Sequence, residues 1–509
     1  MRRTRAVGRP GTLAVFREDI TGPERGFAMG AVRFDEEFDV VVLGAGAAGA
    51  AAALSAHAAG ARVVVLEKAD PATAGGNTRV SGAGWFINRD PERAAVFLRS
   101  LCGPFPVAED VVEAWARETA LNSTWLRELG AEVGASAQYH TEAEYLGLDG
   151  SDCYAGMDTV GARMGNFLLY DFLLGALTDR GIEVRFRTPA TELLAESGGV
   201  TGVQTGDGRR IRAQGGVVLA TGGFAANPRM VRDHLGLSDA PIWGSPHSTG
   251  DGHRMAQRLG ADLWHMGNMM TITGVRIDAG PGAFLALWAA HHYLFVGADG
   301  LRFVDETAEN RHGHIYRNGE LELFPQRRFH LNFDERMRAA GPLSPSREVL
   351  PVGWKLLMED FSWSADNSAE IDRGLIRRAD SLAELAELID VEPATLERTV
   401  ARYNKACEAG HDDSFGRSPR TLAPVSQPPF YVLEVAPLLG WSNGGPRRDG
   451  RARVLDVDGA AIAGLYAAGE VSSTYSWAKD GGFHIADALA FGRVAGREAA
   501  DRADAARFA

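Results

Sequence analysis

The chain of 509 residues is too long for a single hydrophobic core, so we expect two or three domains. A hydrophobic content of 45% and a charged content of 23% are typical of a globular protein, and a formal net charge of −13 argues against a nucleic-acid partner. Three scattered cysteines show no disulfide, haem or iron–sulfur spacing, and no run of about 18 apolar residues could cross a membrane, so we expect a cytoplasmic protein.

Residues 1–34 are expected to form a poorly ordered extension. The twin arginine Arg2-Arg3 resembles the start of an export signal, but the apolar run that follows, Thr12-Leu-Ala-Val-Phe16, is too short for one. We therefore expect no cleaved leader, and Met29 could be the natural first residue.

The stretch from Phe38 to Gly49 predicts a dinucleotide-binding turn. A run of apolar residues forms a buried strand, and Gly44, Gly46 and Gly49 then make the pattern G-x-G-x-x-G. The first glycine permits a tight turn, the second lets a pyrophosphate approach the backbone, and the third lets the following helix pack closely on the strand.

The elements that follow stand in the order that nucleotide binding requires. A helix over residues 47–57 would turn the positive end of its dipole toward the phosphates. A second strand over residues 62–67 ends in Glu67, whose carboxylate can accept hydrogen bonds from both hydroxyls of an adenosine ribose and would repel a 2′-phosphate. A tight turn in some other α/β domain is the alternative, but the joint order favours a dinucleotide other than NADP.

The next part of the chain predicts helices, a small antiparallel meander and a second strand that ends in glycine. Helices are expected at residues 91–134 and 165–180, and strands at 181–187, 190–194, 199–204, 209–213 and from Gly216 into Gly222-Gly223. This arrangement is rare in dehydrogenases that bind NAD alone and is typical of flavoproteins of the glutathione-reductase type, so it indicates FAD.

A third strand ends in glycine near the C-terminus, at residues 464–470, and a helix of small residues follows at 486–499. The long region before them carries more charge and more aromatic residues and has no glycine-rich strand ends. We therefore expect an FAD-binding domain at residues 35–270 and 426–509, with a capping domain for the substrate inserted at residues 271–425.

These blocks together resemble the FAD-dependent fumarate reductase/succinate dehydrogenase flavoprotein superfamily, which includes tricarballylate dehydrogenase and the 3-ketosteroid dehydrogenases. The matching runs are residues 44–67, Gly75-Gly-Asn-Thr78, 217–223, 248–252, Gly300-Leu-Arg-Phe-Val-Asp-Glu306 and 464–496. The block at 300–306 resembles the R-F-V-[ND]-E signature of this superfamily. The resemblance implies an α/β fold, in which a Rossmann-like FAD-binding domain of the glutathione-reductase type carries an inserted α+β capping domain.

The resemblance also implies which residues hold FAD. The expected contacts are Gly44, Ala45, Gly46, Ala47, Ala48, Gly49, Glu67, Lys68, Gly75, Gly76, Asn77, Thr78, Ser81, Gly82, Ala190, Thr221, Gly222, Asp251, Gly469, Glu470 and Ile485. Superfamily members with covalent FAD carry a histidine in the loop that here reads Asn77-Thr-Arg79, so the resemblance implies noncovalent FAD.

Enzymes of this superfamily act on a carbon–carbon bond beside a carbonyl or carboxylate. A hydride passes between the substrate β-carbon and flavin N5, and a proton moves at the α-carbon. The resemblance therefore implies an FAD-dependent dehydrogenase or ene-reductase for a small-molecule substrate, with an electron donor or acceptor that the sequence does not identify.

Three positions depart from the patterns of known members. Trp441 stands where fumarate reductases carry a histidine, and Lys479 stands where they carry an arginine, whose planar fork can bind a carboxylate through two parallel hydrogen bonds. Trp477 stands where the 1-dehydrogenating steroid enzymes carry a tyrosine. These changes put fumarate itself in doubt and favour another substrate, of which a bulky ketone or steroid-like molecule is one expectation.

The candidates for proton transfer are Lys479, His484, Tyr475 and Arg338. Lys479 has the positional argument just given, and His484 precedes the expected flavin contact Ile485. Arg338 lies in a segment that resembles the one carrying the proton-delivering arginine of the superfamily. The structural alternatives are a solvated loop lysine, a packed histidine and the surface charges of a helix.

Two other functions fit the nucleotide motifs: a flavin monooxygenase or oxidase, and a protein that binds flavin without turnover. The block at 300–306 and the inserted domain argue against the first, whereas the replaced positions keep the second open. We expect no metal site, because His312 and His314 alone do not supply enough ligands.

Overall fold

The computed structural model describes residues 33–508, apart from short gaps at 137–140, 162–167, 197–198, 278–281, 288, 308–311, 318, 326, 349, 351 and 359–360. From Phe34 onward the chain forms one compact unit. The extension expected at residues 1–34 lies almost wholly outside the described residues, so that expectation stays a prediction.

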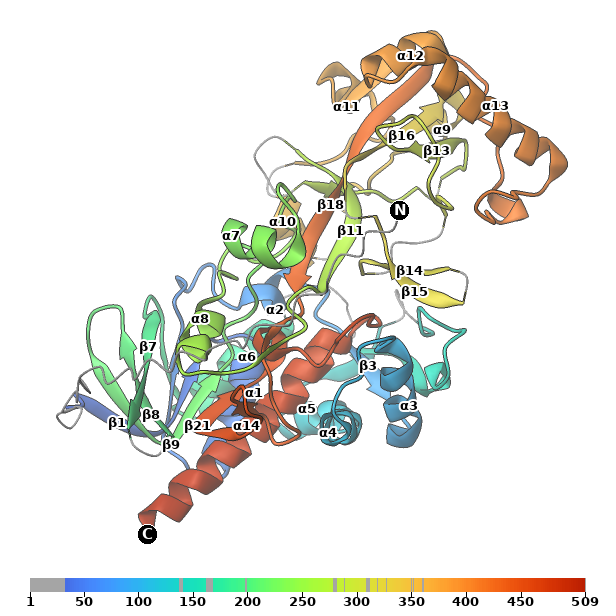
Figure 1. Ribbon diagram of the computed structural model, residues 1–509. Coiled ribbons are helices and arrows are strands. Elements are labelled where there is room, and N and C mark those ends of the chain that lie inside the picture. Colours follow the sequence, from blue (N-terminus) through green and yellow to red (C-terminus); the bar gives the residue numbers. More distant parts are fainter. Residues whose placement is uncertain are drawn as a thin grey trace, which may run out of the picture. The chain divides into compact units, whose positions relative to one another are not determined.

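The glycine-rich turn lies at the end of a strand in an eight-stranded mixed sheet (Figure 1). Its strands are β1 (Glu36–Leu43), β2 (Val63–Leu66), β6 (Glu183–Arg185), β7 (Ala190–Glu196), β8 (Gly199–Thr205), β9 (Arg210–Leu219), β20 (Arg453–Leu455) and β21 (Ala461–Ala467). Their order in space is β20-β21-β9-β1-β2-β6, and the hairpin of β7 and β8 joins through β9.

The centre of this sheet is parallel. Strand β1 pairs in parallel with β2 on one side and with β9 on the other, and β9 pairs in parallel with β21. The last six residues of β1 are all buried, as expected for a parallel strand that is covered on both faces. The carboxyl ends of these strands therefore meet at one edge, which is where parallel sheets bind ligands.

Strand β9 is longer than the sequence predicts, because it joins the two strands that were expected at residues 209–213 and from Gly216 onward. A Cβ atom at Gly215 would lie only 1.9 Å from the carbonyl oxygen of Ala499, in helix α14 (Phe483–Arg507). Gly215 therefore marks a close approach of this helix to the strand.

Helix α1 (Ala47–Ala58) follows the glycine-rich turn and packs closely against α14 (Figure 1). Every residue of α1 from Ala47 to Ala56 is buried. A helix that is apolar on all sides is stable only inside a protein, so the alanine-rich sequence explains why α1 is buried against both α14 and the sheet.

A second, six-stranded antiparallel sheet is built mainly from the region expected to form the cap. Its strands are β11 (Met269–Val275), β12 (Ala283–Phe284), β13 (Tyr293–Val296), β16 (Phe329–Asp334), β17 (Ile376–Ala379) and β18 (Phe430–Ser442). The chain was expected to return to the FAD-binding domain at residue 426, yet β18 still pairs with β11, β16 and β17. This sheet therefore extends beyond the predicted boundary, and the domain limits themselves stay a prediction.

The signature block at residues 300–306 forms a buried ion-pair network beside this sheet. Glu306 accepts hydrogen bonds from Arg302 Nε at 2.7 Å and from Arg417 Nη1 at 3.1 Å. Arg302 also donates to Asp412 Oδ2 at 3.0 Å. Breaking a buried pair of this kind costs roughly 3–5 kcal/mol, so the block stabilises the fold of this region.

The remaining strands of the described residues form three small sheets, and helices make up the rest of the regular structure. These strands are β3 (Trp85–Asn88), β4 (Val133–Ala135), β5 (Tyr154–Val160), β10 (Leu263–Trp264), β14 (His314–Arg317), β15 (Glu320–Leu323) and β19 (Gly445–Pro446). The three sheets are β3-β5-β4, β10-β19 and β14-β15. The other helices are α2 (Gly76–Val80), α3 (Pro91–Leu101), α4 (Glu109–Thr119), α5 (Asn122–Glu128), α6 (Leu168–Asp179), α7 (Pro228–Met230), α8 (Asp251–Arg258), α9 (Glu335–Ala340), α10 (Val352–Met358), α11 (Ser368–Asp372), α12 (Leu382–Leu388) and α13 (Pro393–Ala409).

Candidate active site

A cavity of about 300 Å³ lies where β1, β2, β9 and β21 end, and its wall also includes residues of β11 and β18. The cofactor residues expected from the sequence line this cavity, with the exception of Ala45 and Gly49. Those on the wall are Gly44, Gly46, Ala47, Ala48, Glu67, Lys68, Gly75, Gly76, Asn77, Thr78, Ser81, Gly82, Ala190, Thr221, Gly222, Asp251, Gly469, Glu470 and Ile485.

Ala45 and Gly49 shape the glycine-rich turn from behind the cavity wall. The backbone N–H of Ala45 donates to Glu67 Oε2 at 2.9 Å, which joins the turn to the end of β2. A Cβ atom at Gly49 would lie 1.8 Å from the carbonyl oxygen of Gly44, so only glycine permits this approach. Both residues thus fix the backbone conformation of the turn, which lines the cavity at Gly44 and Gly46.

Gly46 gives the cavity access to the backbone at the start of α1. Its φ is −72°, and a Cβ atom there would find Thr78 Oγ1 at 3.4 Å and Gly75 O at 3.5 Å, which are ordinary contacts. Because neither backbone strain nor crowding requires glycine at this position, the missing side chain serves to open a path to the first turn of the helix. A phosphate group fits that path, since helix N-termini attract anions.

Glu67 stands at the end of β2 with its carboxylate on the cavity wall. It accepts backbone hydrogen bonds from Ala45 and, at 2.8 Å, from Ala69. Each carboxylate oxygen has a second acceptor position, so Glu67 can still accept from the hydroxyls of a ribose. The residues at this end of the cavity therefore fit the adenosine diphosphate part of FAD.

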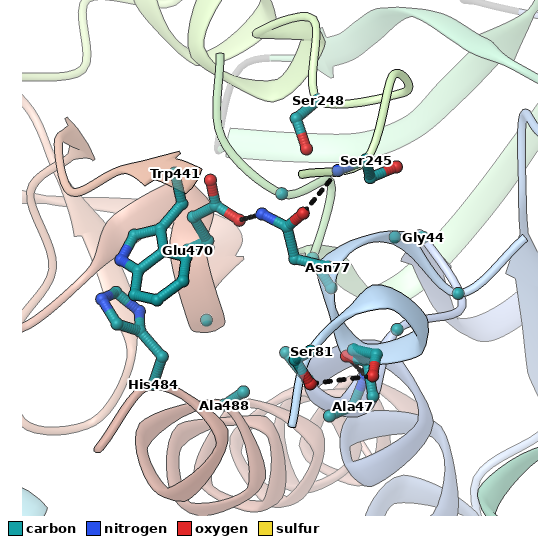
Figure 2. A pocket seen from close by; sticks show the side chains of 18 of the residues that line it. Gly44, Ala47, Asn77, Ser81, Ser245, Ser248, Trp441, Glu470, His484 and Ala488 are labelled. Atoms are coloured by element: carbon teal, nitrogen blue, oxygen red, sulfur yellow. Dashed lines mark hydrogen bonds between the residues drawn. The ribbon is translucent and has the colours of Figure 1, made fainter. Parts of the chain in front are cut away.

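Asn77, in α2, links two other walls of the cavity (Figure 2). Its Nδ2 donates to Glu470 Oε2 at 2.7 Å, and its Oδ1 accepts from the backbone N–H of Ser245 at 2.7 Å. Glu470 also accepts from the backbone N–H of Ser442 at 3.3 Å. Burial raises the pKa of Glu470 to about 7, although the hydrogen bond from Asn77 opposes this shift.

An ion pair joins the end of β2 to the start of α8 across the cavity wall. Lys68 Nζ lies 2.6 Å from Asp251 Oδ2 and donates to Thr249 Oγ1 at 2.6 Å. Both charged side chains keep about a quarter of their surface exposed, at 26% for Lys68 and 28% for Asp251. They are therefore accessible from the cavity, as expected for residues near a ribose and a pyrophosphate.

At the other end of the cavity, Trp441 contacts two of the predicted catalytic residues. The Nζ atom of Lys479 lies 4.7 Å from the centroid of the Trp441 ring, which is a cation–π contact. The ring of His484, in the first turn of α14, lies 4.9 Å from that of Trp441, and Figure 2 shows the two side chains next to each other. Lys479, His484 and Trp441 all line the cavity.

Burial changes the protonation of both basic groups. It lowers the pKa of Lys479 to about 8, while the charges of Glu144 and Asp480 oppose the shift. Burial and the charge of Lys479 hold the pKa of His484 well below its usual range, so this imidazole is neutral at neutral pH. Its Nε2 atom is buried and has no hydrogen-bond partner among the described residues. Perturbed basic groups of this kind, placed together in a cavity, are typical of functional sites.

Apolar side chains line the cavity next to this basic group. They are Val80, Trp243, Met270, Ile272 and Trp354. Within the part of the chain that the structure describes, no arginine lines the cavity. The arrangement therefore suits a molecule with a flat apolar body and one polar oxygen.

The other two predicted catalytic residues do not line the cavity. The hydroxyl of Tyr475 donates to the carbonyl oxygen of Phe483 at 2.6 Å and accepts from Trp115 Nε1 at 3.0 Å, and its side chain is fully buried. Arg338, in α9, donates from Nε to Glu335 Oε2 at 2.8 Å. The polar groups of both residues bind partners outside the cavity, which speaks against a role in this cavity, and their catalytic role stays a prediction.

Several residues that line the cavity were not predicted as part of the site, among them Met270, Ile272, Trp354 and His312. Met270 and Ile272 are two positions apart on β11 and so share one face of the strand, a signal that becomes readable once the strand is known. Trp354, in α10, gave no such signal. His312 was considered only as a metal ligand, and its position on the cavity wall was not expected.

The described residues contain neither a membrane-spanning helix nor a group of metal ligands. No helix among them is both long enough and apolar enough to cross a membrane. No group of three or more histidine, cysteine, aspartate or glutamate side chains in those same segments is placed to hold a metal ion.

Comparisons with known proteins agree with this arrangement. The chain is 28% identical to NADH:acrylate oxidoreductase of Vibrio harveyi, over 92% of this chain and 51% of that protein, so it spans about half the length of this relative. It is 29% identical to 3-oxosteroid 1-dehydrogenase of Mycobacterium tuberculosis, over 92% of this chain and 99% of that protein.

The fold is similar to that of a solved structure, 3-ketosteroid delta1-dehydrogenase from Sterolibacterium denitrificans in complex with 1,4-androstadiene-3,17-dione. The TM-score is 0.75, and the alignment covers 92% of this chain and 100% of that chain at 22% identity. This likeness confirms the expected fold class, with a Rossmann-like FAD-binding domain and a cap. Residues 39–483 match the family model described as FAD binding domain. The chain therefore belongs to this family of FAD-binding proteins.

Proposed function

We propose that the protein is an FAD-dependent oxidoreductase that transfers a hydride between flavin N5 and a carbon–carbon bond beside a carbonyl or carboxylate. One observation carries this proposal: a single cavity joins the open backbone at Gly46 to the buried group of Trp441, Lys479 and His484. A cofactor held at the first end would extend toward a substrate held at the second.

The residues at the first end are proposed to hold FAD without a covalent bond. When bound, FAD supplies N5 as the acceptor or donor of the hydride. Gly46 and the first turn of α1 would face the pyrophosphate, Glu67 the adenosine ribose, and Asn77 with Glu470 the flavin half. The absence of a histidine from the sequence of residues 77–79 supports noncovalent attachment.

The residues at the second end are proposed to bind and polarise the substrate. The ammonium group of Lys479 would bind the carbonyl or carboxylate oxygen and stabilise the negative charge that develops there when the α-carbon loses or gains a proton. His484, which is neutral, would donate a hydrogen bond to the same region. The cap residues around them would exclude water, which strengthens these electrostatic interactions.

The apolar wall supports a substrate that carries a ring. Trp243, Trp354 and Trp441 provide flat surfaces, whereas Lys479 offers one cation and no bidentate fork. We therefore propose an α,β-unsaturated ketone or monocarboxylic acid with a ring, or its saturated counterpart, rather than fumarate. The relatives from Vibrio harveyi and Mycobacterium tuberculosis are named for acrylate and for a 3-oxosteroid. Both compounds belong to this broad class.

The proposal leaves the electron donor or acceptor to experiment. The relative from Vibrio harveyi is named for NADH, so NADH belongs in any test of donors. The cytoplasmic location stays a prediction from the cysteine pattern of the sequence.

The test uses the purified protein loaded with FAD. Acid precipitation should leave the flavin in the supernatant, as expected for a noncovalent cofactor. The protein, reduced without oxygen by NADH or dithionite, is then mixed with benzylideneacetone, cyclohexenone, cinnamate or fumarate. We expect the visible flavin band to return fastest with benzylideneacetone and slowest with fumarate.

Two results would contradict the proposal. A flavin that stays reduced with every compound would favour a protein that binds flavin without turnover. A flavin that is re-oxidised only by oxygen, with hydroxylation of the added compound, would favour a monooxygenase.

A further inference from the structure

The cavity contains an imidazole–carboxylate pair to which the proposed function gives no role. His312 lines the cavity just before β14, and its Nδ1 atom lies 3.0 Å from Glu144 Oε2. The two side chains are only 17% and 10% exposed. Because it is sheltered from solvent, this contact is screened little by salt, and the carboxylate attracts the imidazole ring whenever the ring is protonated.

The backbone at His312 adopts a conformation that is uncommon for a residue with a side chain. Its φ is +55°, in the left-handed region, and the φ of the next residue, Gly313, is +98°. Histidine is one of the residues that enters this region more often than most, yet few residues other than glycine do so. Backbone outliers cluster at functional sites, and this one belongs to a residue on the cavity wall.

His312 is close to the basic group at the substrate end of the cavity. Its ring lies 6.1 Å from that of Trp441, which in turn contacts Lys479 and His484. The carboxylate of Glu144 pairs with His312 and also stabilises the charge of Lys479. Three basic side chains therefore surround Trp441, and the carboxylate of Glu144 interacts with two of them, His312 and Lys479.

Two of the other candidates for proton transfer are occupied outside the cavity, and the proposed function uses His484 as a hydrogen-bond donor to the substrate. Arg338 binds Glu335, and the hydroxyl of Tyr475 is bonded to Phe483 and Trp115 outside the cavity. The proposed function uses the cation of Lys479 to hold the substrate oxygen. A hydride transfer of this type also needs a group that moves the proton at the α-carbon.

We propose that His312 is the catalytic residue that moves the proton at the substrate α-carbon, with Glu144 as the residue that positions it. This inference rests on the proposed function. In the oxidative direction, the α-carbon–hydrogen bond breaks and its proton passes to the His312 imidazole, which accepts it in its unprotonated form. The β-carbon–hydrogen bond breaks as well, and this hydrogen leaves with both electrons to oxidised FAD.

The atoms and electrons of this step balance. The electron pair left on the α-carbon forms the new double bond to the β-carbon, so the substrate loses two hydrogens and two electrons. FAD accepts the hydride, and His312 holds the proton as an imidazolium that Glu144 stabilises. The reductive direction is the reverse of each of these transfers.

The experiment follows proton transfer and hydride transfer separately. Benzylacetone is added, without oxygen and in D₂O, to protein that carries oxidised FAD. Nuclear magnetic resonance measures the exchange of its methylene α-hydrogens for deuterium, and visible absorbance measures the reduction of the flavin. The FAD content, the melting temperature and the dissociation constant of benzylacetone are measured for each variant.

Three variants are compared with the wild type. His312→Asn removes the base, and Glu144→Gln keeps the shape of its partner but removes the charge. His411→Asn is the matched control, because His411 forms a similar pair with Asp413, 3.0 Å between Nε2 and Oδ1, with both side chains exposed at 69% and 91%.

The proposal predicts that His312→Asn slows α-hydrogen exchange and flavin reduction by about 10²- to 10⁴-fold, with the affinity for benzylacetone close to that of the wild type. Glu144→Gln should slow both by a smaller factor and shift the pH profile of exchange, and His411→Asn should change neither. If His312→Asn does not fold or loses its FAD, slowed exchange in a folded Glu144→Gln protein supports the proposal.

Two results would overturn the proposal. If His312→Asn or Glu144→Gln retains FAD and exchanges and reduces at the wild-type rates, His312 does not move the proton, while reduction of the wild-type flavin still supports the proposed function. If the wild type neither exchanges the α-hydrogens nor reduces its flavin with benzylacetone, both this inference and the substrate class of the proposed function are contradicted.

Discussion

Asn77 and Glu470 are 393 positions apart in the sequence, yet a hydrogen bond of 2.7 Å joins Asn77 Nδ2 to Glu470 Oε2. The bond connects the glycine-rich loop after β2 to the turn after β21, and both residues lie on the cavity wall (Figure 2). It therefore fixes the distance between two segments that the proposed cofactor must contact at the same time.

Loss of this bond should weaken FAD binding. Asn77→Ala leaves Glu470 Oε2 without its donor, and a hydrogen bond to a charged group contributes about 1.5–3 kcal/mol, so we expect the affinity for FAD to fall about tenfold to a hundredfold. Fluorescence titration of FAD measures this. Asn404→Ala is the control, because Asn404 bonds to the backbone of Val425 away from the cavity. Wild-type affinity in Asn77→Ala would show that the bond does not shape the FAD site.

Two alanine substitutions in the glycine-rich turn should have different consequences. At Gly46 the new Cβ meets protein atoms only at 3.4 Å or beyond, so the flavin-free protein should keep its melting temperature while its FAD affinity falls. At Gly49 the new Cβ would lie 1.8 Å from the carbonyl oxygen of Gly44, and overpacking costs about 1–3 kcal/mol or more, so the melting temperature should fall. Thermal denaturation and FAD titration test both. Normal FAD binding by Gly46→Ala would contradict a phosphate at this position.

The rate should depend on pH through Lys479. Burial lowers the pKa of this ammonium group to about 8, so the cation that is proposed to hold the substrate oxygen is present below that pH and is lost above it. We therefore expect kcat/KM for benzylideneacetone to decrease above a pH of about 8 in the wild type. In Lys479→Arg, whose side chain stays protonated, the decrease should move to higher pH. An unchanged profile in that variant would assign the decrease to another group.

Trp441 should contribute to the preference for substrates with a ring. Its ring contacts Lys479 and His484 at the proposed substrate end, and an aromatic pair contributes about 0.5–1.5 kcal/mol beyond the area it buries. Trp441→Ala should therefore raise the KM for benzylideneacetone about tenfold relative to that for acrylate, and Trp441→Phe should keep most of the preference. Steady-state kinetics with both compounds measures the ratio. Equal changes for the two compounds would show that Trp441 does not select for the ring.

The nucleotide half of the site could be predicted almost residue by residue, because its signals are local. Each glycine that leaves room for a phosphate or for a neighbouring backbone stands at a fixed spacing from a strand. The position of Glu67 is predicted in the same way, because it stands at the end of the next strand. The signature block at 300–306 predicted the superfamily correctly, although Glu306 binds Arg302 and Arg417 and does not reach the cavity.

The substrate half could be predicted only in part, because distant segments form it. Lys479 and His484 lie in a motif with a fixed spacing and were expected, whereas Trp354 and His312 reach the cavity through the packing of other segments. Tyr475 was expected in the cavity, but its hydroxyl is bonded to Trp115, which is 360 positions away. No local pattern in the sequence reveals a partner at that distance.

A single-turnover experiment with benzylideneacetone tests directly whether the reduced flavin transfers a hydride to a carbon–carbon bond in this cavity. The protein, loaded with FAD and reduced without oxygen, is mixed with this ketone, and flavin absorbance and products are measured together. We predict that the flavin becomes oxidised and that one equivalent of benzylacetone forms per flavin with the same rate constant. A flavin that stays reduced, or one that becomes oxidised while no benzylacetone forms, would contradict hydride transfer to a carbon–carbon bond in this cavity.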